Sequence, residues 1–254
     1  RFENITLTGS GGTGGGGLSI NNSNAGITLG QGAYICGNAT TGNGGGILIA
    51  SGQLTIETGS TISHNKASNG GGIYVGGGSV TFTNGSIAKN TANPSGGGVY
   101  IGSGEFTMDG GEIKANIGTS SGGGVYINSS GTFNFAGGYI SGNTTGSVNA
   151  NPGRSVYING TFNVSGSAAC EMPTNGTITN DVFLAHGKQV VITGILSSNN
   201  ASSTPAKSFM LNFDSTAWQA GETVITTTNT QDYQRIDLAF NLPFTINNTS
   251  GHLQ

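Results

Sequence analysis

The sequence predicts an all-β fold, a parallel β-helix in which each coil of the chain stacks on the one before it. A motif that starts with three glycines recurs about every 26 residues, and a fixed period of this size is typical of solenoid proteins. Each repeat holds three short runs in which apolar and polar residues alternate, as they do in half-buried strands. No window places apolar residues at helical spacing.

The repeat units can be read directly from the glycine triplets. Four units align closely, and they span residues 44–69, 70–95, 96–121 and 122–152. A looser unit precedes them at 15–43 and another follows at 153–176. The stretch 177–200 matches more poorly and is expected to add one more coil. Each unit therefore predicts one coil of three short strands joined by glycine-rich corners.

Stacking turns equivalent positions of the units into columns of side chains that face a shared core. The first strand places inward Ile47, Ile73, Val99, Val125 and Val156, with Ile49, Val75, Ile101, Ile127 and Ile158 beside them. The second places inward Leu54, Val80, Phe106, Phe133 and Phe162, then Ile56, Phe82, Met108, Phe135 and Val164. The third contributes Ile35, Ile62, Ile87, Ile113 and Ile140. Burial of these side chains favours a stack of coils over any single coil.

The glycine triplets, such as 70–72, are expected at a corner where the chain turns sharply directly above and below its copies. Glycine allows positive φ and has no Cβ that would collide with the next coil. A phosphate-binding loop is the competing interpretation of such a run. No triplet is followed by Lys-Ser or Lys-Thr, and no helix is predicted to open after one, so this interpretation is excluded.

A column of asparagines lies three residues after the inward isoleucine of the third strand. Stacked Asn amides can hydrogen-bond along a ladder, and Asn tolerates left-handed turns. We therefore predict a structural ladder, whose members are Asn38, Asn65, Asn90, Asn116 and Asn143.

The outward position of the first strand predicts a surface ladder of tyrosines. Its members are Leu48 followed by Tyr74, Tyr100, Tyr126 and Tyr157. Three interpretations stay open: intramolecular ring stacking that stiffens the strand face, contact with a partner protein, or a platform for sugars.

Composition limits the remaining functions. Only 7% of the residues are charged and the formal net charge is -3, which gives no basic surface for nucleic acid or anionic lipid. No stretch approaches the roughly 18 apolar residues of a membrane-spanning helix. His64, His186 and His252 are scattered, so we expect no metal site, and no cofactor is predicted.

Acidic residues are the remaining candidates for catalysis. Glu105, Asp109 and Glu112 share one unit, but their neighbours in the stack are mostly uncharged, and Lys114 is expected to offset Glu112. Glycoside cleavage uses a pair of carboxyl groups. This patch therefore predicts a solvated face, and we assign no catalytic residues and expect no enzyme.

The two cysteines are expected to be too far apart to join. Cys36 and Cys170 lie about five coils apart, roughly 24 Å at ordinary strand spacing. Bridged Cα atoms lie within about 7 Å. Cys36 aligns with the outward positions Ser63, Ala88 and Lys114, and it is either free or paired with another molecule.

The pattern of Gly-Gly-Gly-Ile/Val followed by Ile-x-x-Asn over residues 15–160 resembles known bacterial repeats. It is similar to the GGA[IV]/FxxN repeats of polymorphic outer-membrane proteins, with Ile in place of Phe. It is also similar to repeats in large surface proteins of spirochaetes and gut bacteria. The resemblance implies a right-handed β-helix displayed at a bacterial surface, with roles in adhesion, display or autotransport and no shared catalytic residues.

These observations divide the chain into a solenoid over 1–200 and a C-terminal β-strand cap over 201–254, in which Trp218 packs. The run Phe2–Leu7 has no comparable cap. We expect an extracellular or cell-surface structural or adhesive protein that associates with itself through its ends, into a fibre, or with a host or matrix surface. The alternative is a β-helix that binds or cleaves polysaccharide.

Overall fold

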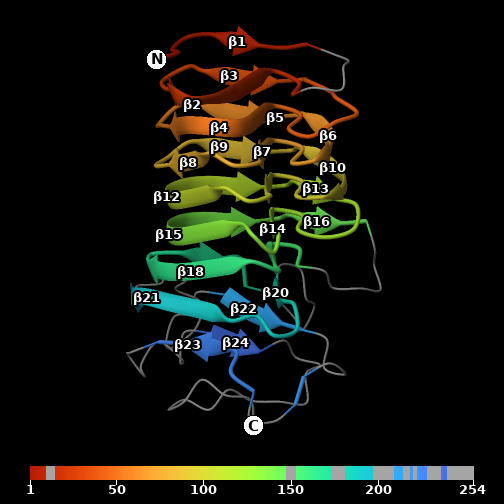
Figure 1. The fold of residues 1–254 in the computed structure, drawn as a ribbon, viewed down its shortest axis with the longest axis vertical. Coiled ribbons are helices and arrows are strands. Elements are labelled where there is room, and N and C mark those ends of the chain that lie inside the picture. Colours follow the sequence, from red (N-terminus) through yellow and green to blue (C-terminus); the bar gives the residue numbers. More distant parts are fainter. Residues whose placement is uncertain are drawn as a thin grey trace.

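The chain folds into a parallel β-solenoid of about seven turns, which confirms the predicted all-β fold. The computed structural model describes residues 1–9, 15–146, 153–172, 181–196, 209–213, 218–219, 222–227 and 236–238. Within these ranges every strand pairing is parallel and no helix occurs. Figure 1 shows the coils stacked along the long axis, from the N-terminal coil to the C-terminal one.

The first predicted strand forms a ladder that runs along the whole described stack. Tyr100, for example, pairs in register with Tyr74 on one side and Tyr126 on the other. The ladder consists of β2 (Leu18–Leu29), β4 (Ile47–Ile56), β7 (Ile73–Val75), β11 (Val99–Ile101), β14 (Val125–Ile127), β17 (Val156–Ile158), β20 (Val182–Leu184), β22 (Phe209–Asn212) and β24 (Ile236–Leu238).

The second strand forms a ladder to which the long strands β2 and β4 also contribute, because they continue through the first corner without a break. Phe106 pairs with Val80 and Phe133 in this ladder. Its other members are β8 (Ser79–Phe82), β12 (Glu105–Lys114), β15 (Thr132–Ser141), β18 (Thr161–Gly166), β21 (Val190–Leu196) and β23 (Ile225–Thr226).

The third strand carries the isoleucine column, in which Ile87 pairs with Ile62 and Ile113. Strands β12 and β15 turn from the second ladder into this one through irregular register near Asp109. The remaining members are β1 (Thr6–Leu7), β3 (Tyr34–Cys36), β5 (Thr61–Ser63), β9 (Ser86–Ala88) and β19 (Ala169–Cys170).

A fourth ladder, which was not predicted, lies between the asparagine column and the glycine triplets. Its inward positions are small, because Ala67 pairs with Ala92, and Ala92 pairs with Gly118. Such short, polar segments lack the β-branched and aromatic residues that mark strands in a sequence. The ladder consists of β6 (Lys66–Asn69), β10 (Thr91–Ser95), β13 (Ile117–Gly118) and β16 (Thr144–Thr145).

The apolar columns meet in one continuous core, as predicted. Val99, Ile87 and Phe106 have no exposed surface, and the same holds for their counterparts in neighbouring coils. Each fully buried side chain of this kind contributes roughly 1.5–3 kcal/mol. Because a coil shares this surface with the coils on either side, the stack is stable where one coil would not be.

The three glycines of each triplet have two different roles. Gly70 takes a positive φ of 64°, where other residues would be strained. Gly71 and Gly72 instead lie against the next coil. A Cβ on Gly71 would lie 2.5 Å from the Thr91 carbonyl oxygen, and one on Gly72 would lie 2.6 Å from that of Gly98. The triplet therefore combines a sharp turn with close backbone packing.

The described strands beyond residue 200 extend the same ladders. Strand β22 pairs in parallel with β20, β24 pairs with β22, and β23 pairs with β21. The predicted boundary at residue 200 lies outside the described residues. Trp218 is buried and packs against Phe213 and His186, with ring centroids 5.5 and 5.2 Å away.

Candidate functional site: tyrosine stack, asparagine ladder and polar groove

The tyrosines of the first ladder form one continuous stack on the outside of the solenoid. Ring centroids lie 5.2 Å apart for Tyr74 and Tyr100, 4.8 Å for Tyr100 and Tyr126, and 5.0 Å for Tyr126 and Tyr157. Neighbouring planes differ by at most 11°. Phe183, which was not predicted, extends the stack, with its ring centroid 5.3 Å from that of Tyr157. Phe183 occupies the same outward position as the tyrosines, in register with Tyr157. It could have been predicted from that position, although its unit, 177–200, matches the repeat poorly.

This arrangement restricts what the tyrosines can bind. Each inner ring is covered on both faces by its neighbours, so ring edges and hydroxyl groups, not ring faces, are left for a ligand. The geometry favours intramolecular stacking over a sugar platform made of ring faces. Burial, together with the negative charge that Tyr126 and Tyr74 would carry when ionised, raises the pKa of Tyr100 to about 12.

The asparagine column forms a buried amide ladder inside the solenoid. The side-chain nitrogen of each residue donates to the side-chain oxygen of the next, at 2.9–3.0 Å. That same oxygen also accepts the backbone N–H of the preceding asparagine, at 2.9–3.0 Å. The second amide hydrogen reaches a backbone carbonyl, such as that of Ile62 from Asn90 at 2.9 Å. All amide dipoles point the same way along the axis, so each bond polarises the next.

The two ends of the asparagine ladder differ. Asn38 begins it, and its buried side-chain oxygen has no hydrogen-bond partner among the described residues. Asn143 ends it, and in the next coil the carboxylate of Glu171 accepts the Gly142 N–H at 2.8 Å, in place of the backbone carbonyl used in earlier coils. The ladder is thus a structural feature that runs through five coils and lies away from solvent.

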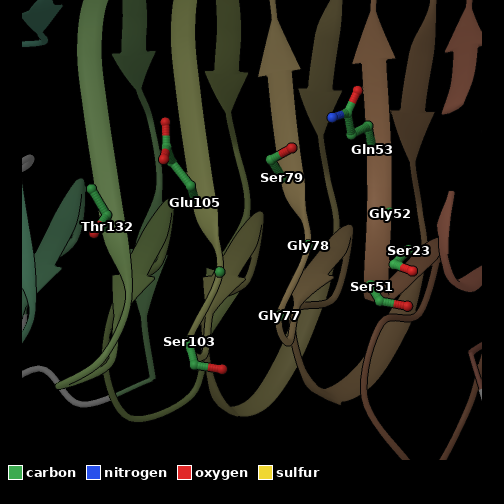
Figure 2. Close-up of a pocket in the computed structure, with 11 residues that line it drawn as sticks. Ser23, Ser51, Gly52, Gln53, Gly77, Gly78, Ser79, Ser103, Glu105 and Thr132 are labelled. Atoms are coloured by element: carbon green, nitrogen blue, oxygen red, sulfur yellow. The ribbon is translucent and has the colours of Figure 1, made fainter. Parts of the chain in front are cut away.

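A polar groove of about 440 Å³ crosses the corner between the first and second strands. Figure 2 shows its lining residues coming from successive parallel coils, with Thr132, Glu105, Ser79 and Gln53 in one row across neighbouring strands. The groove is lined by Ser23, Ser51, Gly52, Gln53, Gly77, Gly78, Ser79, Ser103, Gly104, Glu105 and Thr132. This groove was not predicted from the sequence.

A second column of glycines forms the groove floor. A Cβ on Gly78 would lie 2.3 Å from the Gly52 carbonyl oxygen, and one on Gly104 would lie 2.3 Å from that of Gly78. Side chains are therefore excluded at these glycine positions, and the surface recedes there. The tyrosine stack borders the same corner, because a Cβ on Gly102 would lie 3.0 Å from the Tyr74 hydroxyl.

The acidic residues of the third aligned unit do not form one site. Glu105 lines the groove, and its Oε1 accepts hydrogen bonds from Asn134 at 2.9 Å and Thr107 at 3.3 Å. Glu112 pairs with Lys114, as expected, and both are well exposed. Asp109 is exposed and does not line the groove.

Other titratable groups serve the structure. Asp181 is fully buried and accepts the Arg154 N–H at 2.7 Å and the Asn212 amide at 2.9 Å, which joins three coils. Burial raises its pKa, and these hydrogen bonds oppose the rise. Cys36 and Cys170 are both free thiols. The described residues contain no cluster of histidine, cysteine and acidic side chains suited to a metal ion.

No protein-family model, curated protein or solved structure matches this chain. Within the described ranges, no helix is long and apolar enough to cross a bilayer.

Proposed function

We propose that the chain is an extracellular structural or adhesive β-solenoid of a bacterial surface. The observation that supports it is the uninterrupted parallel stack, whose core and buried amide ladder continue from coil to coil. Such a stack makes a stiff, elongated body with a long lateral surface. The resemblance of its glycine triplets and Ile-x-x-Asn motifs to bacterial surface repeats supports the location.

End-to-end assembly into a fibre is part of this proposal. Among the described residues, β1 pairs only with β3, so its other edge has no strand partner. Unpaired backbone groups at an edge favour pairing with another chain. Because the Ile5 carbonyl accepts the Tyr34 N–H, the backbone groups of Thr6 face the opposite, open side.

Electron microscopy and light scattering of the purified protein test assembly. We expect filaments or oligomers whose length grows with concentration, and shorter ones for Thr6→Pro, because proline cannot donate at the edge. Monodisperse monomers at every salt and protein concentration would refute the fibre. Adhesion is tested separately, by attachment of protein-coated beads to host cells and matrix proteins.

Polysaccharide binding is a second candidate, favoured by the polar groove. Hydrolysis of a glycoside uses two carboxyl groups on either side of the bond. Glu105 is the one carboxylate among the groove-lining residues. We therefore propose binding without cleavage for this candidate.

A further inference from the structure

The groove runs along the solenoid axis, across the strands. Its lining residues come from five successive coils, from Ser23 in the first to Thr132 in the fifth. At an ordinary strand spacing of about 4.8 Å this corresponds to a length of roughly 19 Å. The site is therefore suited to an extended chain more than to a compact small molecule.

Most polar side chains along the groove make no hydrogen bond to other described residues of the protein. The side chains of Ser51, Gln53, Ser79 and Thr132 have no hydrogen-bond partner in the described part of the chain, although each is wholly or partly exposed. Ser103 differs, because its hydroxyl donates to the Gly76 carbonyl of the preceding coil. A row of hydroxyl and amide groups thus faces outward at coil spacing, ready to donate and accept.

The charge of the groove excludes anionic ligands. No lysine or arginine lines it, and Glu105, from the fourth of its five coils, supplies a negative charge. The Glu105 carboxylate is held in place through Oε1, whereas Oε2 has no partner among the described residues. A fixed carboxylate oxygen of this kind accepts hydrogen bonds from hydroxyl groups.

The groove also differs from a protein-docking surface. Protein interfaces have an apolar, often aromatic centre, whereas every lining residue here is glycine, serine, threonine, glutamine or glutamate. The strands beside the groove are paired on both sides, so they offer no free edge to an added peptide strand.

We propose that this groove binds a neutral polysaccharide whose chain lies parallel to the solenoid axis. The serine, threonine and glutamine side chains hydrogen-bond the sugar hydroxyls, Glu105 accepts from them, and the glycines of the corner form the floor beneath the chain. The inference rests on the second candidate function and is independent of the structural role.

Native gels that contain laminarin, dextran, mannan or xyloglucan test this inference, with polygalacturonate as the anionic comparison. We expect at least one neutral polysaccharide to retard the protein. Ser79→Trp fills the middle of the groove from an outward position and should weaken this binding by about tenfold or more. Gln53→Ala removes one hydrogen-bonding group and should weaken it about two- to tenfold.

Ser86→Trp is the matched control, because Ser86 is also a half-exposed serine on an outward strand position but lies on the third ladder, off the groove. It should bind like the unmodified protein, and circular dichroism should show all variants folded. Retardation by polygalacturonate alone, no retardation by any neutral glycan, or equal binding by Ser79→Trp would each overturn the proposal. Fibre length should be unchanged in Ser79→Trp, so failure of glycan binding leaves the structural role unaffected.

Discussion

At the scale of single residues, Asn90 is the clearest case of a side chain that joins three coils. It accepts the backbone and side-chain N–H groups of Asn65 at 3.0 Å each, and donates to the Ile62 carbonyl at 2.9 Å and the Asn116 amide at 3.0 Å. It has no exposed surface. Its removal leaves buried polar groups without partners, which costs far more than the loss of one exposed hydrogen bond.

We therefore expect Asn90→Ala to lower the free energy of unfolding by about 3–5 kcal/mol. The matched control is Asn163→Ala, because the half-buried Asn163 makes one side-chain hydrogen bond within the described residues, to Asn134 at 2.8 Å. That change should cost about 1 kcal/mol or less. Urea unfolding measures both changes in the free energy of unfolding. Equal decreases would show that a hydrogen bond in the buried ladder contributes no more to stability than a half-buried one.

A comparison of Gly71 with Gly26 tests whether glycine is required for packing between coils. A Cβ at Gly71 would meet the carbonyl oxygens of Thr91 and Gly97 at 2.5 and 2.6 Å, whereas one at Gly26 would meet no atom within 4 Å. Gly71→Ala should cost about 3 kcal/mol or more, because backbone of the next coil must move. Gly26→Ala should change stability by less than about 1 kcal/mol, in the stabilising direction. Thermal unfolding of the two variants checks this, and similar melting temperatures would contradict it.

At the scale of elements, the tyrosine stack couples five successive strands of the first ladder through their outward faces. Rings about 5 Å apart with nearly parallel planes cover part of one another's surface. This burial raises the pKa values of Tyr100, Tyr126 and Tyr157. The stack therefore makes the stability of this face sensitive to alkaline pH.

Tyr100 should contribute most to this dependence of stability on alkaline pH. Its pKa is raised from 10.0 to about 12, chiefly by burial. Between these values the folded protein holds a proton that the unfolded chain has lost, so stability decreases as pH rises through this window and is fully present below it. Urea unfolding across this range should show a smaller decrease for Tyr100→Phe than for the unmodified protein. An identical decrease in the variant would mean that Tyr100 ionises freely in the folded state.

At the scale of the whole molecule, the reactivity of the two cysteines measures how tightly two distant parts of the stack are packed. Cys36 lies near the N-terminal coils and is half-buried, whereas Cys170 lies in the sixth coil and is fully buried. Cys170 occupies the inward isoleucine column, in register with Ile140. Burial raises the pKa of its thiol to about 12, although a hydrogen bond with Ser155 opposes the rise.

Thiol labelling of the native protein should therefore modify Cys36 alone. Cys170 should react only when the surrounding coils open, because neither thiolate nor reagent is present in the closed core. Mass spectrometry should find one label per native chain and two after unfolding in denaturant. The Cys36→Ser variant should remain unlabelled while folded, and rapid labelling of Cys170 in it would contradict the tight C-terminal core.

The sequence by itself determined which residues lie over one another. Its period, its alternating runs and its glycine triplets placed Ile73 under Val99, Phe106 under Phe133 and Asn90 under Asn116, because a repeated local pattern can stack in only one register without exposing its apolar face. The three main ladders and the buried core follow from this register alone.

Only the tertiary structure decided features that depend on contacts between coils. The fourth ladder is made of small polar segments such as Lys66–Asn69, whose pairing is set by neighbours and not by strand propensity. The groove exists because the glycines at one corner pack against carbonyl oxygens of the preceding coil and leave no room for a Cβ. The orientation of the tyrosine rings depends on the rings above and below them. These arrangements arise from distances between chain segments that are far apart in sequence, so no local pattern encodes them.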